Sequence, residues 1–173
     1  MKIFYRKISF FCFSFLMACI LELSAQGGLI TLGTGTVQNT STTYPAPYGN
    51  WYWGARNQFL ITASELNSAA PNITKIFSLA FDVATANGVA LQNFEIKIGH
   101  TSQSALTTWQ TGLTSVYFNS SYTETPGWNT HTFSTPFNWN GTNNIVVETC
   151  FNNSSFTYNA VVKMTTQLVT SSI

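Results

Sequence analysis

Apolar and polar residues alternate along several stretches of this chain. Residues 73–84 place apolar side chains at almost every second position, with Thr, Ser and Asp between them. Residues 91–100 do the same, since Phe94, Ile96 and Ile98 share one parity and polar side chains occupy the other. Successive side chains of a strand point to opposite sides, so a period of two predicts a β-strand with one buried face.

Asn-Gly dipeptides separate two pairs of such stretches. These are 73–84 and 91–100 around Asn87-Gly88, and 128–139 and 144–151 around Asn140-Gly141. Asn-Gly is the dipeptide that most readily takes the positive φ of a tight turn. The sequence therefore predicts two antiparallel hairpins.

Four further stretches have strand character, and one short stretch has a helix signal. The additional strands are expected at residues 29–36, 58–62, 113–122 and 158–165. Thr62 and Glu65 have capping-box spacing, which predicts one or two helical turns near Leu66. Eight or nine short strands joined by turns rich in Gly, Asn and Ser predict an all-β fold, an antiparallel β-sandwich with a jelly-roll-like arrangement.

The first 25 residues follow a different pattern. Lys2, Arg6 and Lys7 precede an apolar stretch, and Ala25 is a small residue placed for cleavage before Gln26. This order predicts a signal peptide at residues 1–25. We expect residues 26–173 to form one domain that is secreted or displayed on a cell surface, without a membrane span. Two alternatives stay open: a retained membrane anchor, and a lipidated N-terminus at Cys19, which follows a partial lipobox.

The mature domain carries few charges, and they nearly balance. Its formal net charge is −1, from Arg56, Lys75, Lys97 and Lys163 against Glu65, Asp82, Glu95, Glu124 and Glu148. Capture of nucleic acid or of an anionic membrane needs clustered Lys and Arg, so this composition disfavours both partners. A surface hydrated by hydroxyls and amides suits an extracellular β protein. The sequence does not indicate an oligomeric state.

Catalytic chemistry has little support in the sequence. Glu95 and Glu148 are the candidates for a glycosidase carboxylate pair, but both have the polar parity of their strands, as surface carboxylates do. His100 and His131 have no nearby second ligand for zinc. Cys150 is expected to be a buried, inert thiol. We therefore expect no catalytic residue, no metal site and no cofactor.

An aromatic segment supplies the candidate binding residues. It reads YPAPYGNWYWG from Tyr44 to Gly54, and the candidates are Trp51, Tyr52, Trp53, Asn50 and Arg56. Exposed rings with amide and guanidinium groups beside them are suited to a sugar. The alternative is that the rings close the core at one end of the sandwich. On an extended strand Tyr52 would point opposite to Trp51 and Trp53, so at least one large ring should meet solvent.

Several motifs, in order, are similar to a module of secreted Bacteroidetes proteins. They are GTGT from Gly33, the aromatic segment, RNQFLITASEL from Arg56, FEIKIGHTS from Phe94 and GWNTHTFSTPFNWNGTNNIVVETCFNN from Gly127. The resemblance implies a place ahead of fibronectin type III or PKD-like modules and a type IX secretion sorting domain, and no catalytic motif. It also implies a further strand and more domains beyond Ile173, so we expect either a truncated protein or a short single-module relative.

Together these patterns favour a non-enzymatic structural or binding module of a cell-surface protein. Its partners would be an extracellular glycan or another surface protein, in binding or adhesion. Carbohydrate binding is the leading specific activity. The alternative is a glycoside hydrolase or an accessory domain of one, which would require two carboxylates facing each other across a cleft.

Overall fold

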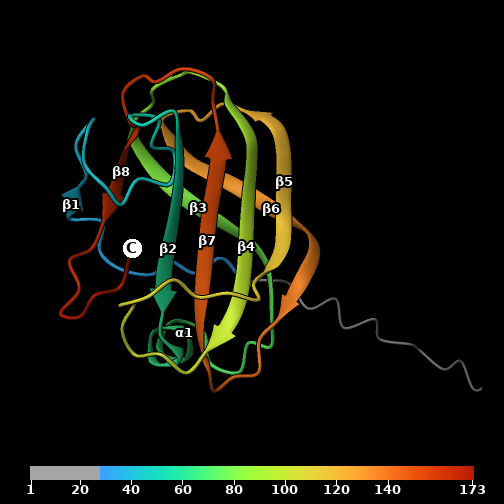
Figure 1. Ribbon diagram of the computed structural model, residues 1–173. Helices are drawn as coiled ribbons and strands as arrows, with labels where there is room; N and C mark the ends of the chain where they lie inside the picture. The colour runs from blue at the N-terminus through green and yellow to red at the C-terminus, as the bar shows by residue number, and fades with distance from the viewer. Residues whose placement is uncertain (1–27) are drawn as a thin grey trace, which may run out of the picture.

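The protein is a β-sandwich of two antiparallel four-stranded sheets in the computed structural model, which describes residues 28–173 (Figure 1). The front sheet has the order β2 (Gly54–Ile61), β7 (Asn144–Asn152), β4 (Leu91–Thr101) and β5 (Thr114–Tyr122). The back sheet has the order β1 (Val37–Gln38), β8 (Val161–Met164), β3 (Lys75–Thr85) and β6 (Gly127–Asn138). The predicted antiparallel sandwich of about eight strands is confirmed. The predicted signal peptide and Cys19 lie outside the described residues.

Both predicted hairpins are wrong. β3 and β4 flank Asn87-Gly88 but lie in different sheets, and β6 and β7 around Asn140-Gly141 do so too. Only the glycine of each dipeptide has a positive φ, so neither connection forms the two-residue turn that the dipeptide favours. Alternation shows which face of a strand is buried, but it does not show which strand is the neighbour. Both connections therefore cross from one sheet to the other.

Several strand boundaries also differ from the prediction. Residues 29–36 form no strand, and the first strand is the two-residue β1. β2 begins at Gly54, four residues earlier than expected. Phe77 shares the parity of the apolar positions in residues 73–84 but is exposed, because the β3–β6 register shifts between Ile76 and Ser78. A bulge of this kind turns the following side chains to the other face of the sheet.

The predicted helix is present as α1 (Ala63–Ala69), with both halves of its capping box. The Thr62 amide donates to the Glu65 carboxylate at 2.8 Å, and the Glu65 amide donates to the Thr62 hydroxyl at 3.2 Å. These bonds satisfy donors that have no partner within the first helical turn. Within residues 28–173, no helix has the length and apolar character needed to cross a membrane.

The core lies between the two sheets and is rich in aromatic rings. The front sheet contributes the apolar parity of β4, as predicted, together with alternate residues of β7. The largest fully buried side chain is Tyr48, which comes from the loop before β2. His131 on β6 is also fully buried among aromatic rings. A loop residue and a histidine thus occupy the centre of the core.

The neighbours Phe81 and Asp82 test the register of β3. Phe81 packs on the rings of Tyr48, Phe59 and His131, whereas Asp82 forms an ion pair with Lys163 at 2.7 Å. We expect Phe81→Ala to lower the free energy of unfolding by about 3 kcal/mol. Asp82→Ala should cost about 1 kcal/mol or less, since a surface ion pair contributes little. Denaturant titration measures both, and equal losses would contradict the assigned register.

Candidate functional site

The aromatic segment from Tyr44 to Gly54 divides between core and surface. Tyr48 is fully buried, whereas Tyr52 and Trp53 are 71% and 56% exposed. Trp51 is half-buried. One part of the segment therefore closes the core, through Tyr48, and the other part offers rings to solvent. The two roles that the sequence left open belong to different residues.

Residues 50–53 form a turn, so the alternation expected of an extended strand is wrong. The Trp53 amide donates to the Asn50 carbonyl at 3.4 Å, and Trp53 has a φ of 72°. A positive φ is incompatible with an extended course. Tyr52 and Trp53 consequently both face solvent, instead of pointing to opposite sides.

A second loop, residues 153–159, adds rings beside this turn. The ring of Trp51 stacks on Tyr158 at 5.9 Å and meets the edge of Phe156 at 6.0 Å. We call this surface the end patch, and it consists of Tyr44, Trp51, Tyr52, Trp53, Phe156 and Tyr158. It adjoins the start of β2 and the end of β7, at the end of the sandwich opposite α1 (Figure 1). Tyr44, Phe156 and Tyr158 were not among the residues predicted from the sequence, although the aromatic residues within NNSSFTYN are a signal for the last two.

Hydrogen bonds between the two loops fix the end patch. The Asn153 amide donates to the Trp53 carbonyl at 2.8 Å, and the Thr157 amide donates to the Asn50 carbonyl at 3.0 Å. The Asn50 side chain is fully buried and donates to the Thr157 hydroxyl at 2.8 Å. Asn50 therefore positions the rings from beneath, and it is not the exposed ligand contact that the sequence suggested.

The rings of the end patch surround an open hollow. Trp51, Tyr52, Trp53 and Phe156 line a space of about 440 Å³. No charged side chain lines it. An apolar, uncharged hollow with flat walls suits a ligand that has an apolar face and no net charge.

Arg56, the fifth candidate, belongs to a different surface. It points from β2 to the outer face of the front sheet, where its Nε and Nη2 atoms donate to Glu148 at 2.8 Å and 2.7 Å. The Trp109 ring centroid lies 4.5 Å from its Cζ atom. The sequence placed Arg56 beside the aromatic turn, but its side chain does not join the end patch.

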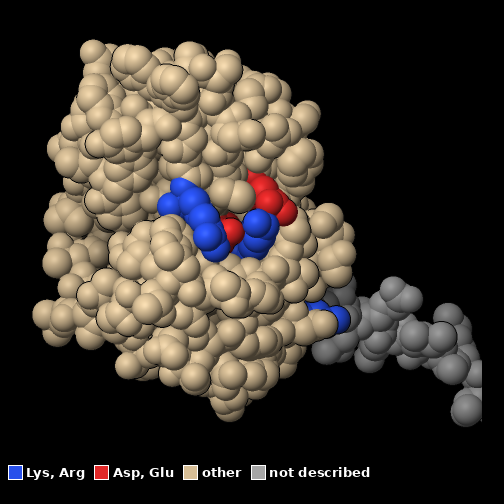
Figure 2. All heavy atoms as spheres, viewed as in Figure 1, with Lys and Arg blue, Asp and Glu red and all other residues tan. Residues whose placement is uncertain are grey.

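Four charged side chains meet on this outer face, and we call them the charged cluster: Arg56, Glu148, Lys97 and Glu95. The Lys97 ammonium lies 3.2 Å from Glu95 and 3.4 Å from Glu148. Figure 2 shows the cluster as a compact group near the middle of a face that is otherwise almost free of charged residues. The cluster has two positive and two negative members and so carries no net charge.

Glu148 is buried, contrary to the expectation of a surface carboxylate. Its side chain is 3% exposed, and it accepts hydrogen bonds from Arg56 and from Gln58. Gln58 is in turn bonded to Gln110, in the loop of residues 102–113. Burial raises the pKa of Glu148, but the hydrogen bonds from Arg56 and Gln58 and the charges of Arg56 and Lys97 outweigh it and lower that pKa.

Two other reactive side chains, His100 and Cys150, lie at different positions along the β4–β7 pair. His100, at the end of β4, accepts the Asn140 amide at 3.2 Å, as expected of a satisfied strand-end histidine. Cys150 is half-buried on the outer face, with its Sγ 3.7 Å from Glu95, instead of fully buried. Burial raises the pKa of its thiol. No group of three or more His, Cys, Asp or Glu residues suited to a metal occurs in residues 28–173.

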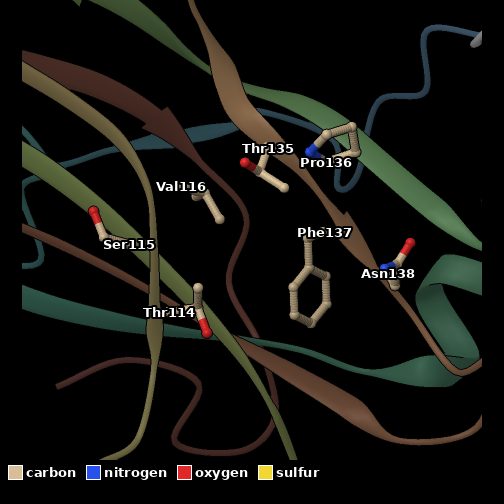
Figure 3. A pocket seen from close by; sticks show the side chains of 7 residues that line it. All are labelled: Thr114, Ser115, Val116, Thr135, Pro136, Phe137 and Asn138. Atoms are coloured by element: carbon tan, nitrogen blue, oxygen red, sulfur yellow. The ribbon is translucent and has the colours of Figure 1, made fainter.

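A second hollow lies between the edges of the two sheets, where β5 faces β6 (Figure 3). Its volume is about 260 Å³, and it is lined by Thr114, Ser115, Val116, Thr135, Pro136, Phe137 and Asn138. None of these side chains is an acid, a base or a strong metal ligand. The residues that line this hollow therefore include no candidate for acid–base catalysis or metal binding.

No family model, curated protein or solved structure matches the chain.

Proposed function

We propose that the protein is a secreted, non-enzymatic module of a bacterial cell-surface protein, and that its end patch binds carbohydrate. The observation that supports this most directly is the open hollow of four rings, which no charged side chain lines. A group of exposed aromatic rings is typical of an interaction site.

The chemistry of the end patch matches that of a sugar. One face of a pyranose ring is made of C–H groups, which can lie on an aromatic ring, while its hydroxyls point outward. Exposed Asn152, Ser154 and Ser155 adjoin the rings and can exchange hydrogen bonds with such hydroxyls. Because hydrogen bonds hold both loops, the rings lose little freedom when a ligand binds.

The protonation and contacts of Glu95 and Glu148, the two carboxylates of the front sheet, favour binding over hydrolysis. A glycoside hydrolase needs one carboxylic acid that keeps its proton, which requires a raised pKa. The pKa of Glu148 is instead lowered, and the Lys97 ammonium lies between Glu148 and Glu95. These contacts are typical of two carboxylates held in ion pairs, and not of the general acid and the second carboxylate of a glycoside hydrolase.

The composition of the domain also bears on its location in the cell and on its partners. A domain with few charges and many Thr, Ser and Asn side chains is suited to the cell exterior. The resemblance to secreted Bacteroidetes modules supports the same location. Its partner would be a glycan or a glycan-bearing surface, and its role adhesion or targeting.

Single ring removals test the end patch. Tyr52→Ala and Trp53→Ala should each weaken retention in gels that contain a neutral polysaccharide by about tenfold or more, as loss of a central aromatic contact does. Both side chains are largely exposed, so the free energy of unfolding should change by only about 0.5 kcal/mol. Affinity electrophoresis gives the retention and denaturant titration gives the stability.

Trp128→Ala is the matched control, because Trp128 is 59% exposed on β6 of the back sheet and is not one of the residues of the end patch. It should leave retention unchanged. Equal retention of all three variants and the unaltered protein would contradict a binding role for the end patch.

A further inference from the structure

A row of side chains crosses the outer face of the front sheet from edge to edge. Phe118 on β5 is paired with Glu95, Glu95 with Cys150 on β7, and Cys150 with Arg56 on β2. Residues directly opposite each other in paired strands point to the same face. Neighbouring strands lie about 4.8 Å apart, so three spacings separate Phe118 from Arg56 by about 14 Å.

An aromatic ring stands at each end of this row. Phe118 is 60% exposed, and Trp109, which lies against the Arg56 guanidinium, is 44% exposed. Trp109 is held in place by its neighbour: the Gln110 amide donates to the Gln58 side chain, and Gln58 donates to the Gln110 carbonyl, both at 2.8 Å. The row is therefore built on a rigid sheet and a loop that is fixed to it.

Stability alone does not account for this arrangement. Arg56 and Gln58 already satisfy the buried Glu148, and surface ion pairs such as Lys97 with Glu95 contribute little to folding. Phe118 is largely exposed and adds little to folding, and the cation–π contact of Trp109 with Arg56 at this exposed site contributes only modestly. Charged groups flanked by exposed aromatic rings are instead the usual components of a recognition surface.

The balance of charge indicates the class of ligand. The charges of Glu95 and of the buried Glu148 would repel an anion, and those of Arg56 and Lys97 would repel a cation, so half of the charged cluster would oppose either. A neutral molecule with adjacent hydroxyls matches both halves, because a hydroxyl donates to a carboxylate and accepts from an ammonium or guanidinium group. The span between the rings is longer than a single sugar.

We propose that this face is a second binding site, for a neutral oligosaccharide that lies across the strands between Trp109 and Phe118. The ligand class rests on the proposed function, but the surface is separate: the row lies on the face of the sheet, and the end patch lies beyond the strand ends. One module would then contact a polysaccharide at two places.

Cys150 provides a direct probe, since it is the central residue of the row and its thiol is free. N-ethylmaleimide adds to the thiol, and peptide mass spectrometry follows the modification at Cys150 alone. We expect hexasaccharides of the cellulose, xylan or mannan type to slow the modification in a saturable way. Trp109→Ala and Phe118→Ala should each lose this protection, and Trp128→Ala should keep it.

The end-patch variant Tyr52→Ala separates the two sites. It should reduce gel retention and yet leave Cys150 protected. Normal retention without protection of Cys150 by any of the three hexasaccharides would overturn the second site and leave the proposed function standing. Protection by oligogalacturonate alone would overturn the neutral ligand class. Absence of both retention and protection would overturn both proposals.

Discussion

Tyr48→Ala should lower the free energy of unfolding by about 4–5 kcal/mol, the largest loss expected of any single ring in this protein. The Tyr48 ring is fully buried and packs on Phe81, Phe94 and Tyr122 at centroid distances of 5.5–5.8 Å. Its hydroxyl lies 2.7 Å from His131 Nε2. Removal of the ring leaves a cavity in the centre of the core and a buried nitrogen without its partner.

Two other variants separate these contributions in a denaturant titration. Tyr48→Phe keeps the ring and removes only the hydroxyl, so it should cost about 1–3 kcal/mol. Trp51→Ala removes a half-buried ring of the end patch and should cost clearly less than Tyr48→Ala. A loss at Trp51 equal to that at Tyr48 would show that the tryptophan also closes the core.

Acid should destabilise the protein by about 3 kcal/mol between pH 6.5 and pH 4 through His131 alone. Burial lowers the pKa of His131 from 6.5 to about 4 in the folded state. In this interval the unfolded chain binds a proton that the folded protein does not, so stability falls by about 1.4 kcal/mol per pH unit. The contribution is fully retained above pH 6.5 and levels off below pH 4.

The difference between the protein and its His131→Phe variant isolates this effect from the carboxylates. Urea titrations at several pH values should give a smaller loss of stability for His131→Phe over the same interval. Tyr48→Phe should keep most of the slope, because burial, which Tyr48→Phe preserves, is the cause of the lowered pKa. Parallel curves for the protein and His131→Phe would contradict a neutral, buried His131.

The sequence predicts the faces of the strands well but their neighbours poorly. Alternation in β4 assigns Phe94, Ile96 and Ile98 to the core, and all three are buried. The capping box at Thr62 likewise predicts α1, because its contacts are local. Pairing depends on contacts between distant residues, so the Asn-Gly connections look like hairpins in the sequence although each joins two sheets.

In the candidate site, too, the contacts between distant residues could not be predicted from the sequence. The sequence placed Tyr52 and Trp53 on opposite sides of a strand, whereas both rings are exposed. Phe156 and Tyr158 join them from a loop about 100 residues away in the sequence. Glu148 has the parity of a surface residue and is nevertheless buried, because the distant loop of residues 102–113 covers it through Gln58 and its partner Gln110. The alternation of residues within one strand cannot predict that a distant loop will bury a side chain of that strand.

The five tryptophans allow one direct test of carbohydrate binding. Trp51 and Trp53 lie in the end patch, Trp109 lies at the charged cluster, and Trp128 is exposed on the back sheet. Trp139 is 3% exposed and donates its indole N–H to the Asn143 carbonyl at 2.7 Å. In a nitrogen-15 NMR titration each indole N–H gives its own signal, which single substitutions to Phe assign.

Titration of the labelled protein with a neutral hexasaccharide should therefore shift the signals of Trp51 and Trp53 in a saturable way, while the signals of Trp128 and Trp139 stay in place. A response at Trp109 would report the second site independently. Unchanged signals of Trp51 and Trp53 at saturating concentrations of cellulose-, xylan- and mannan-type hexasaccharides would contradict carbohydrate binding by the end patch.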